Sequence, residues 1–201
     1  MNDQRRDHQN TLLRSAGNWL VFVVVGVLTA AVGELQFSVF IRGDWANLYG
    51  SMGFNAVYLT GAFLVTRLIF RMTSRRAAFL LCAGLAAVCG LMVEWFAIGN
   101  SPWGNPDANQ VGMAAYWACL VIVPLIVIDP NPQLRPLKRK IAIYSLAYTA
   151  AALLGQVVAP AGVWRYVYHI WMVVFGYLGL IIMCLIAYLR CFRLTSPIPA
   201  G

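Results

Sequence analysis

The sequence QVGMAAYWACLVIVPLIVI, residues 110–128, carries no charged side chain and is followed at residues 129–132 by DPNP. Roughly 20 apolar residues in an α-helix, rising about 1.5 Å each, cross the ~30 Å hydrocarbon core of a bilayer. Proline lacks a backbone donor and restricts the residue before it, so the two prolines end a helix here. The stretch therefore predicts a transmembrane helix that ends at residue 128.

Five further apolar stretches of similar length lie on either side of it. Of the 201 residues, 61% are hydrophobic and 11% are charged, and the mean hydropathy is +0.70. This composition excludes a soluble enzyme, a disordered chain and a secreted disulfide scaffold. Backbone groups in hydrocarbon must bond internally, and no run of short alternating segments indicates a β-barrel. We predict an all-α integral membrane protein, a single transmembrane domain over residues 1–201, with six helices at about 19–41, 49–70, 77–99, 110–128, 141–159 and 166–189.

The basic residues predict the orientation of this bundle. The chain has 15 Lys and Arg against 7 Asp and Glu, a net charge of +8. Most of the basic residues form four clusters that alternate with loops lacking excess positive charge: Arg5, Arg6, Arg14; Arg67, Arg71, Arg75, Arg76; Arg135, Lys138, Arg139, Lys140; Arg190, Arg193. Because cytoplasmic loops are rich in Lys and Arg, we predict a cell inner membrane protein with a cytoplasmic N-terminal segment, 1–18, and a cytoplasmic tail, 190–201. No cluster is interleaved with exposed aromatic residues, so no nucleic-acid partner is predicted.

Polar residues recur at similar places in the odd-numbered predicted helices. Glu34 and Glu94 lie 60 residues apart, each shortly before the end of its helix, and Gln156 follows 62 residues later. Each is followed by a tryptophan in a loop predicted to lie outside: Trp45, Trp103 and Trp164. This period is expected of three helical hairpins in parallel orientation, an internal repeat of the kind found in transporters. The alternative is that aromatic outer loops alone produce the resemblance.

The two glutamates are the strongest candidates for a functional site. From the rise per residue, Glu34 lies about 10 Å and Glu94 about 7 Å below the outer ends of their helices. A carboxylate at this depth has a high free-energy cost unless it faces the bundle interior, pairs with another group or carries a proton. An acidic residue in such a position is therefore assigned a functional role by default. We expect both to face one cavity. The alternative is structural: Glu34 pairs with Arg42, and Glu94 joins neighbouring helices by hydrogen bonds.

Further polar and aromatic side chains are candidates for the same cavity. His169 is the only histidine within a predicted helix, and imidazole is an acid–base group near neutral pH. A helical histidine or amide often only bonds a neighbouring helix, and interfacial aromatic residues often only form a belt, so each also has a structural interpretation. The predicted ligand-binding residues are Glu34, Glu94, Gln156, Asn55, Trp45, Trp103, Trp117, Tyr116, Trp164 and His169.

No motif in the sequence fixes a particular chemistry. Because H-x-x-H, C-x-x-C, nucleophile-elbow and P-loop patterns are absent, no metal or cofactor is predicted. We predict binding of a small organic or cationic ligand in an outward-facing acidic and aromatic cavity, with transport, including proton-coupled transport, as the first interpretation. The alternatives are an enzyme in which Glu34 and Glu94 perform acid–base chemistry on an isoprenoid or lipid, and a non-catalytic subunit or assembly factor of a membrane complex. The predicted partners are the lipid bilayer and a small-molecule ligand. A homo-oligomer and a partner membrane subunit are both compatible with the sequence.

Overall fold

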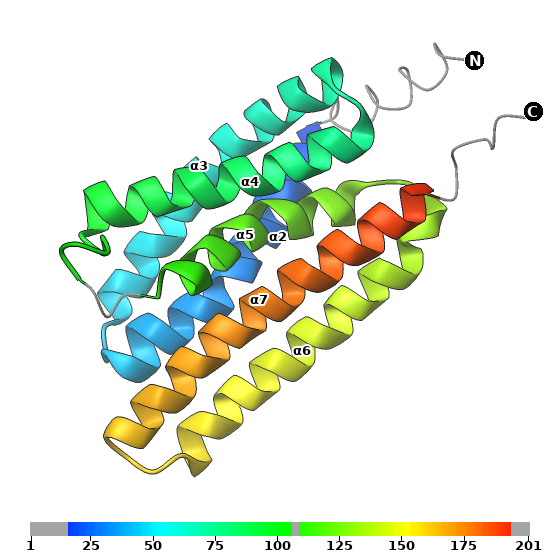
Figure 1. Cartoon of the computed structure of the whole chain (residues 1–201). Helices are drawn as coiled ribbons and strands as arrows, with labels where there is room; N and C mark the ends of the chain where they lie inside the picture. Colours follow the sequence, from blue (N-terminus) through cyan, green and yellow to red (C-terminus); the bar gives the residue numbers. More distant parts are fainter. Residues whose placement is uncertain (1–15, 106–108, 194–201) are drawn as a thin grey trace, which may run out of the picture.

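The computed structural model describes residues 16–105 and 109–193, which contain six long helices and, within those ranges, no strand (Figure 1). All six are long and apolar enough to cross a membrane. The predicted all-α, six-helix fold is thus confirmed and indicates a multi-pass membrane protein. In chain order the elements are α2 Ala16–Glu34, the π-helix η1 Leu35–Ile41, α3 Trp45–Met72, α4 Arg75–Val93, the π-helix η2 Glu94–Ile98, α5 Gln110–Ile128, the 3₁₀ turn η3 Pro132–Leu134, α6 Arg135–Val158 and α7 Val163–Arg193.

Helix α5 lies at the centre of the bundle. It packs against α2, α4 and α7, whereas α6 lies on the outside against α7 (Figure 1). Every residue from Ala115 to Ile126 is buried. A helix that is apolar on all sides must be covered on all sides by protein or lipid, and the charge-free sequence of α5 is covered by its neighbours.

Two glycines allow the helices around α5 to approach closely. A Cβ atom at Gly90 of α4 would lie 1.9 Å from Cγ of Trp117, and one at Gly26 of α2 would lie 2.5 Å from Cδ1 of Leu59. These distances are too short for any carbon–carbon contact, so a side chain at either position would push the helices apart. Gly90 thus allows the ring of Trp117 to lie against the α4 backbone.

The second and sixth helices begin earlier than predicted. The side chain of Asp44 accepts a hydrogen bond from the backbone N–H of Asn47 at 2.9 Å, which caps the first turn of α3. Trp45 is therefore the first residue of α3, and Trp164 lies in the first turn of α7, rather than in loops as predicted. The capping contact that sets the start of α3 is not visible in hydropathy, so the predicted start was too late.

Both glutamates stand where their helix changes from α to π geometry. Glu34 is the last residue of α2 and is followed by η1, and Glu94 is the first residue of η2. A π-helical turn changes the direction in which successive side chains point, and such turns are frequent at functional sites. Near Gln156, by contrast, α6 remains α-helical to Val158. The three hairpins also differ in position, since α5 alone is central, and the three-hairpin repeat stays a prediction.

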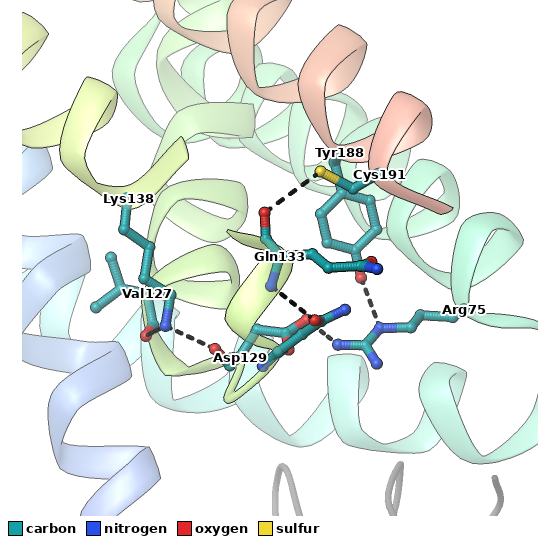
Figure 2. Close-up of polar contacts among 8 residues, drawn as sticks. Arg75, Val127, Asp129, Gln133, Lys138, Tyr188 and Cys191 are labelled. Carbon is teal, nitrogen blue, oxygen red and sulfur yellow. Dashed lines mark hydrogen bonds and ion pairs between the residues drawn. The ribbon is translucent and has the colours of Figure 1, made fainter. Parts of the chain in front are cut away.

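Asp129, at the C-terminal end of α5, joins four helices. Arg75 forms an ion pair with its carboxylate and donates from Nε to the hydroxyl of Tyr188 at 3.1 Å. Lys138 Nζ donates to the backbone carbonyls of Val127 at 2.8 Å and of Asp129 at 2.6 Å. Figure 2 shows these contacts drawing together the ends of α4, α5, α6 and α7. We call this end of the bundle the arginine-rich end; the DPNP sequence ends α5 here as predicted.

Candidate ligand-binding site

A cavity of about 530 Å³ lies at the opposite end of the bundle, which we call the glutamate end. Residues of α2 with η1, α3, α4 with η2, α5 and α7 form its wall, which extends to the loop residues Arg42 and Asn105. Glu34 and Glu94 both line it. The helix packing around α5 thus brings into one cavity two carboxyl groups that are 60 residues apart in the sequence.

Glu34 is held by two hydroxyl groups from different elements. The hydroxyl of Tyr116, on α5, donates to Oε1 at 3.1 Å, and the hydroxyl of Ser38, on η1, donates to Oε2 at 3.1 Å. Ser38 Oγ accepts in turn from Nδ2 of Asn47, on α3, at 2.7 Å. The carboxyl group therefore has a fixed orientation at the junction of three helices.

Arg42 does not pair with Glu34, in contrast to the structural alternative considered for the sequence. Its guanidinium carbon lies instead 4.1 Å from the ring centroid of Phe37. Arginine commonly stacks on an aromatic face in this way. No cation of the described residues forms an ion pair with Glu34, although Arg42 contributes a positive charge to the same cavity wall.

Glu94 is held by donors from two other segments. Trp117 Nε1, on α5, donates to Oε1 at 3.1 Å, and Asn100 Nδ2 donates to Oε2 at 2.8 Å. Gly99, at φ 87°, ends η2 in the left-handed conformation that glycine adopts readily and turns Asn100 back over the carboxylate. Glu94 is 8% exposed, so these two donors serve a nearly buried group.

Asn55 forms part of the cavity wall and has one unsatisfied atom. It lies on α3, is 2% exposed, and donates from Nδ2 to the hydroxyl oxygen of Tyr116 at 3.2 Å. Its side-chain oxygen Oδ1 is buried and has no hydrogen-bond partner. Buried polar atoms in folded proteins are nearly always paired, so this oxygen marks a place where a donor is missing.

Aromatic side chains make up much of the remaining wall. The ring of Trp117 contacts those of Tyr116, at 5.4 Å between centroids, and Phe54, at 6.3 Å, both edge to face. All three line the cavity, together with Phe37. Edge-to-face packing holds the rings in fixed positions, and aromatic faces near carboxylates favour organic cations.

Two predicted site residues belong to a different buried network. His169 Nδ1 lies 3.3 Å from Gln36 Oε1, and its Nε2 lies 3.2 Å from Gln156 Oε1. Gln36 Nε2 also donates to the hydroxyl of Tyr148 at 2.7 Å. None of these four side chains lines the cavity. The network joins η1, α6 and α7, which is the helix-bridging interpretation given for Gln156 and His169 above.

The three tryptophans of the predicted outer loops also lie away from the cavity wall. Trp45 and Trp164 are exposed, and Trp103 is exposed while its ring packs on Trp95, with centroids 5.3 Å apart. Trp95 in turn donates from Nε1 to Oε1 of Gln110 at 2.6 Å. These positions fit the interfacial belt interpretation rather than a stacking platform for a ligand.

Of the predicted residues, the structure brings five together on this wall: Glu34, Asn55, Glu94, Tyr116 and Trp117. Sequence analysis missed Ser38, Asn47 and Asn100, which orient the two carboxyl groups. One signal was present, because asparagines at 100, 105 and 109 cluster in the loop after Glu94. No sequence pattern, however, indicates which of them turns back toward a carboxylate.

The wall offers hydrogen-bond acceptors and negative charge but no metal-binding cluster. In residues 16–105 and 109–193, no group of three or more His, Cys, Asp or Glu side chains is placed to hold a metal ion. Within the part of the chain that the structure describes, the ionisable carboxyl and guanidinium groups on the wall are Glu34, Glu94 and Arg42. The arrangement can therefore compensate one positive charge on an apolar ligand when both carboxyl groups are ionised. Comparison with protein-family models, with curated proteins and with solved structures gave no match for this chain.

Proposed function

We propose that the protein is a membrane transporter of a small organic cation, which binds in the cavity between Glu34 and Glu94. The observation that carries the proposal is that both intramembrane carboxyl groups line a single cavity. A carboxylate in a helix of this kind is retained against a substantial insertion cost, which a ligand-binding role explains. On the positive-inside rule, the arginine-rich end faces the cytoplasm of a cell whose inner membrane holds the protein, and the cavity faces outward.

The wall favours an organic cation over an inorganic one. Phe37, Phe54, Tyr116 and Trp117 line the cavity beside the carboxylates, and an aromatic face attracts a cation that is only weakly hydrated. A volume of about 530 Å³ is within the range of pockets that enclose a drug-sized ligand. The aromatic rings would contact the apolar body of the ligand while the carboxylates compensate its charge.

The contacts that tie the arginine-rich end together support transport over simple binding. The ion pair of Arg75 with Asp129 and the two hydrogen bonds of Lys138 tie four helices together on the side away from the cavity. A carrier with one accessible and one closed side needs such contacts, which must break for the ligand to leave in the other direction. Transport would be coupled to protons if Glu34 or Glu94 binds and releases a proton during each cycle.

The test is uptake into liposomes that contain the purified full-length protein. The probes are radiolabelled benzamidinium and phenyltrimethylammonium, two aromatic monovalent cations, and protein-free liposomes give the passive leak. We expect saturable uptake of at least one probe that falls at least about tenfold in Glu34→Gln and Glu94→Gln, because each variant removes one compensating charge. An imposed pH gradient shows whether uptake is coupled to protons.

Asp44→Asn is the matched control for these variants. Asp44 lies at the same end of the bundle but outside the cavity wall, and asparagine caps a helix as well as aspartate does. Uptake by this variant should equal that of the unmodified protein. Saturable binding without uptake would overturn the transport proposal and favour the enzyme or subunit alternatives, and absence of both would overturn the ligand class.

A further inference from the structure

The unpartnered side-chain oxygen of Asn55 indicates which chemical groups a ligand in the cavity should have. Asn55 is 2% exposed, and its Oδ1 is buried without a hydrogen-bond partner, while the residue forms part of the cavity wall. A buried acceptor that has lost its hydrogen bond to water and has gained no donor in the protein destabilises the folded state. A ligand that brings a donor to this wall removes that cost, whereas a ligand without a donor does not.

Tyr116 fixes which atom of the Asn55 amide is unpartnered. A tyrosine hydroxyl has one proton, and here it is donated to Oε1 of Glu34 at 3.1 Å. The hydroxyl oxygen can then only accept from Asn55, which must present its NH₂ group at 3.2 Å. While Glu34 is ionised, a rotation of the amide by half a turn would place two acceptors against each other, so the oxygen is the free atom.

The donors around the two carboxyl groups are already committed. The hydroxyl protons of Tyr116 and Ser38 go to Glu34, and the N–H groups of Trp117 and Asn100 go to Glu94. Each carboxylate oxygen has further lone pairs, since a carboxylate accepts about four hydrogen bonds. Around the two carboxyl groups, the unused hydrogen-bonding capacity is therefore that of an acceptor, whereas the guanidinium of Arg42 adds donors elsewhere on the wall.

Charge and hydrogen bonding together restrict the class of ligand. With both carboxyl groups ionised and Arg42 on the wall, the described residues of the cavity wall carry one net negative charge. From this, and resting on the function proposed above, we infer that the ligand is a monovalent cation with N–H donors on its charged group, a primary ammonium, amidinium or guanidinium ion, and that Asn55 Oδ1 accepts one of its hydrogen bonds. Asn55 is then a specificity-determining residue that distinguishes such ions from quaternary ammonium ions, which have charge but no donor.

The test is a methylation series measured on the unmodified full-length protein in lipid nanodiscs. The probes are benzylammonium and its N-methyl, N,N-dimethyl and N,N,N-trimethyl derivatives, which keep the ring and the charge while the N–H donors fall from three to none. Affinity is measured by calorimetry at neutral pH. We expect it to fall along the series, with a total loss of about tenfold or more from benzylammonium to the trimethyl ion.

Asn55→Leu assigns the effect to Asn55. This near-isosteric change removes the amide oxygen, so it should weaken benzylammonium binding about tenfold more than it weakens binding of the trimethyl ion, which has no donor for that oxygen. If Asn55→Leu keeps the full preference, the role of Asn55 is wrong. If Asn55→Leu does not fold, the methylation series on the unmodified protein still decides whether donors are recognised.

The two proposals fail in different ways. If all four cations bind equally well and all lose affinity in Glu34→Gln, the cavity binds organic cations as proposed, and the requirement for N–H donors is overturned. If none of the four binds to the unmodified protein, the cation-binding function itself is overturned. A rise in affinity with methylation would also overturn the donor requirement, because it would show that the aromatic rings alone select the ligand.

Discussion

The hydroxyl of Tyr116 lies 3.1 Å from Oε1 of Glu34 and donates a hydrogen bond to it, which links the central helix α5 to the point where α2 becomes η1. The same hydroxyl accepts from Asn55 on α3. One side chain thus orients both a carboxyl group and an amide on the cavity wall. The site is organised from α5 outward, and its geometry depends on how that helix is held.

Tyr116→Phe should disturb the site while preserving the aromatic packing. It leaves Glu34 with one donor fewer and Asn55 Nδ2 without its acceptor, so we expect a loss of about 1–3 kcal/mol in unfolding free energy. Cation affinity should also fall, because the carboxyl group is no longer oriented. Denaturant titration in detergent and calorimetry measure the two effects. Tyr49→Phe, at an exposed tyrosine outside the cavity wall, should change neither, and equal losses in both variants would contradict the role of Tyr116.

Gly90→Ala should separate α4 from α5. The added Cβ would lie 1.9 Å from Cγ of Trp117, so the ring or the helix must move. Overpacking of this kind costs about 1–3 kcal/mol or more. It should also weaken cation binding, because Trp117 holds Glu94.

Gly84→Ala, on the same helix, is the matched control for Gly90→Ala. Nothing lies within 4 Å of a Cβ at this position, so alanine should be neutral or stabilising by up to about 1 kcal/mol through helix propensity. Thermal unfolding of the two variants side by side distinguishes them. Similar unfolding temperatures for the two variants would show that α4 and α5 pack less closely at Gly90 than the structure indicates.

Asp129→Asn should destabilise the arginine-rich end. Its carboxylate is 3% exposed and paired with Arg75, and removing one partner of a buried ion pair costs about 3–5 kcal/mol because the other charge is left uncompensated. If this end closes the transport path, thiol reagents should label Cys184, now fully buried, faster in the variant. Unchanged stability would mean that the ion pair adds nothing to the fold.

Gln156→Leu separates the buried histidine network from the cavity. It removes the partner of His169 Nε2, so we expect a loss of about 1–3 kcal/mol in unfolding free energy. Cation affinity should stay within about twofold of that of the unmodified protein, because Gln156 does not line the cavity and effects of separated sites are independent. A large loss of cation affinity without a loss of stability would show that Gln156 does take part in ligand binding.

The six helices could be predicted from the sequence because bilayer thickness imposes a minimum apolar length on each one. The placement of Glu34 and Glu94 in one cavity could be expected from their cost in hydrocarbon and their similar depth. Tyr116, Trp117 and Asn55 line the same cavity, as predicted for polar and aromatic side chains near the two glutamates.

What could not be predicted depends on helix rotation and local backbone geometry. Hydropathy fixes where a helix lies in the chain but not which side of it faces a cavity, so it could not show that Gln156 and His169 contact each other outside the cavity wall. The change to π geometry at Glu34 and Glu94 has no sequence signature, yet it sets where Ser38 and Asn100 meet the two carboxylates. Long-range partners such as Gln36 and Tyr148 appear only once the helices are packed.

The most direct test of the central claim is a double-mutant cycle on cation affinity with Glu34→Gln, Glu94→Gln and the double variant, measured by calorimetry with benzylammonium. If the two carboxyl groups act on one bound cation, each single variant should lose about tenfold or more in affinity, and the combined loss should differ from the product of the two. Affinity equal to that of the unmodified protein in either single variant would contradict the account.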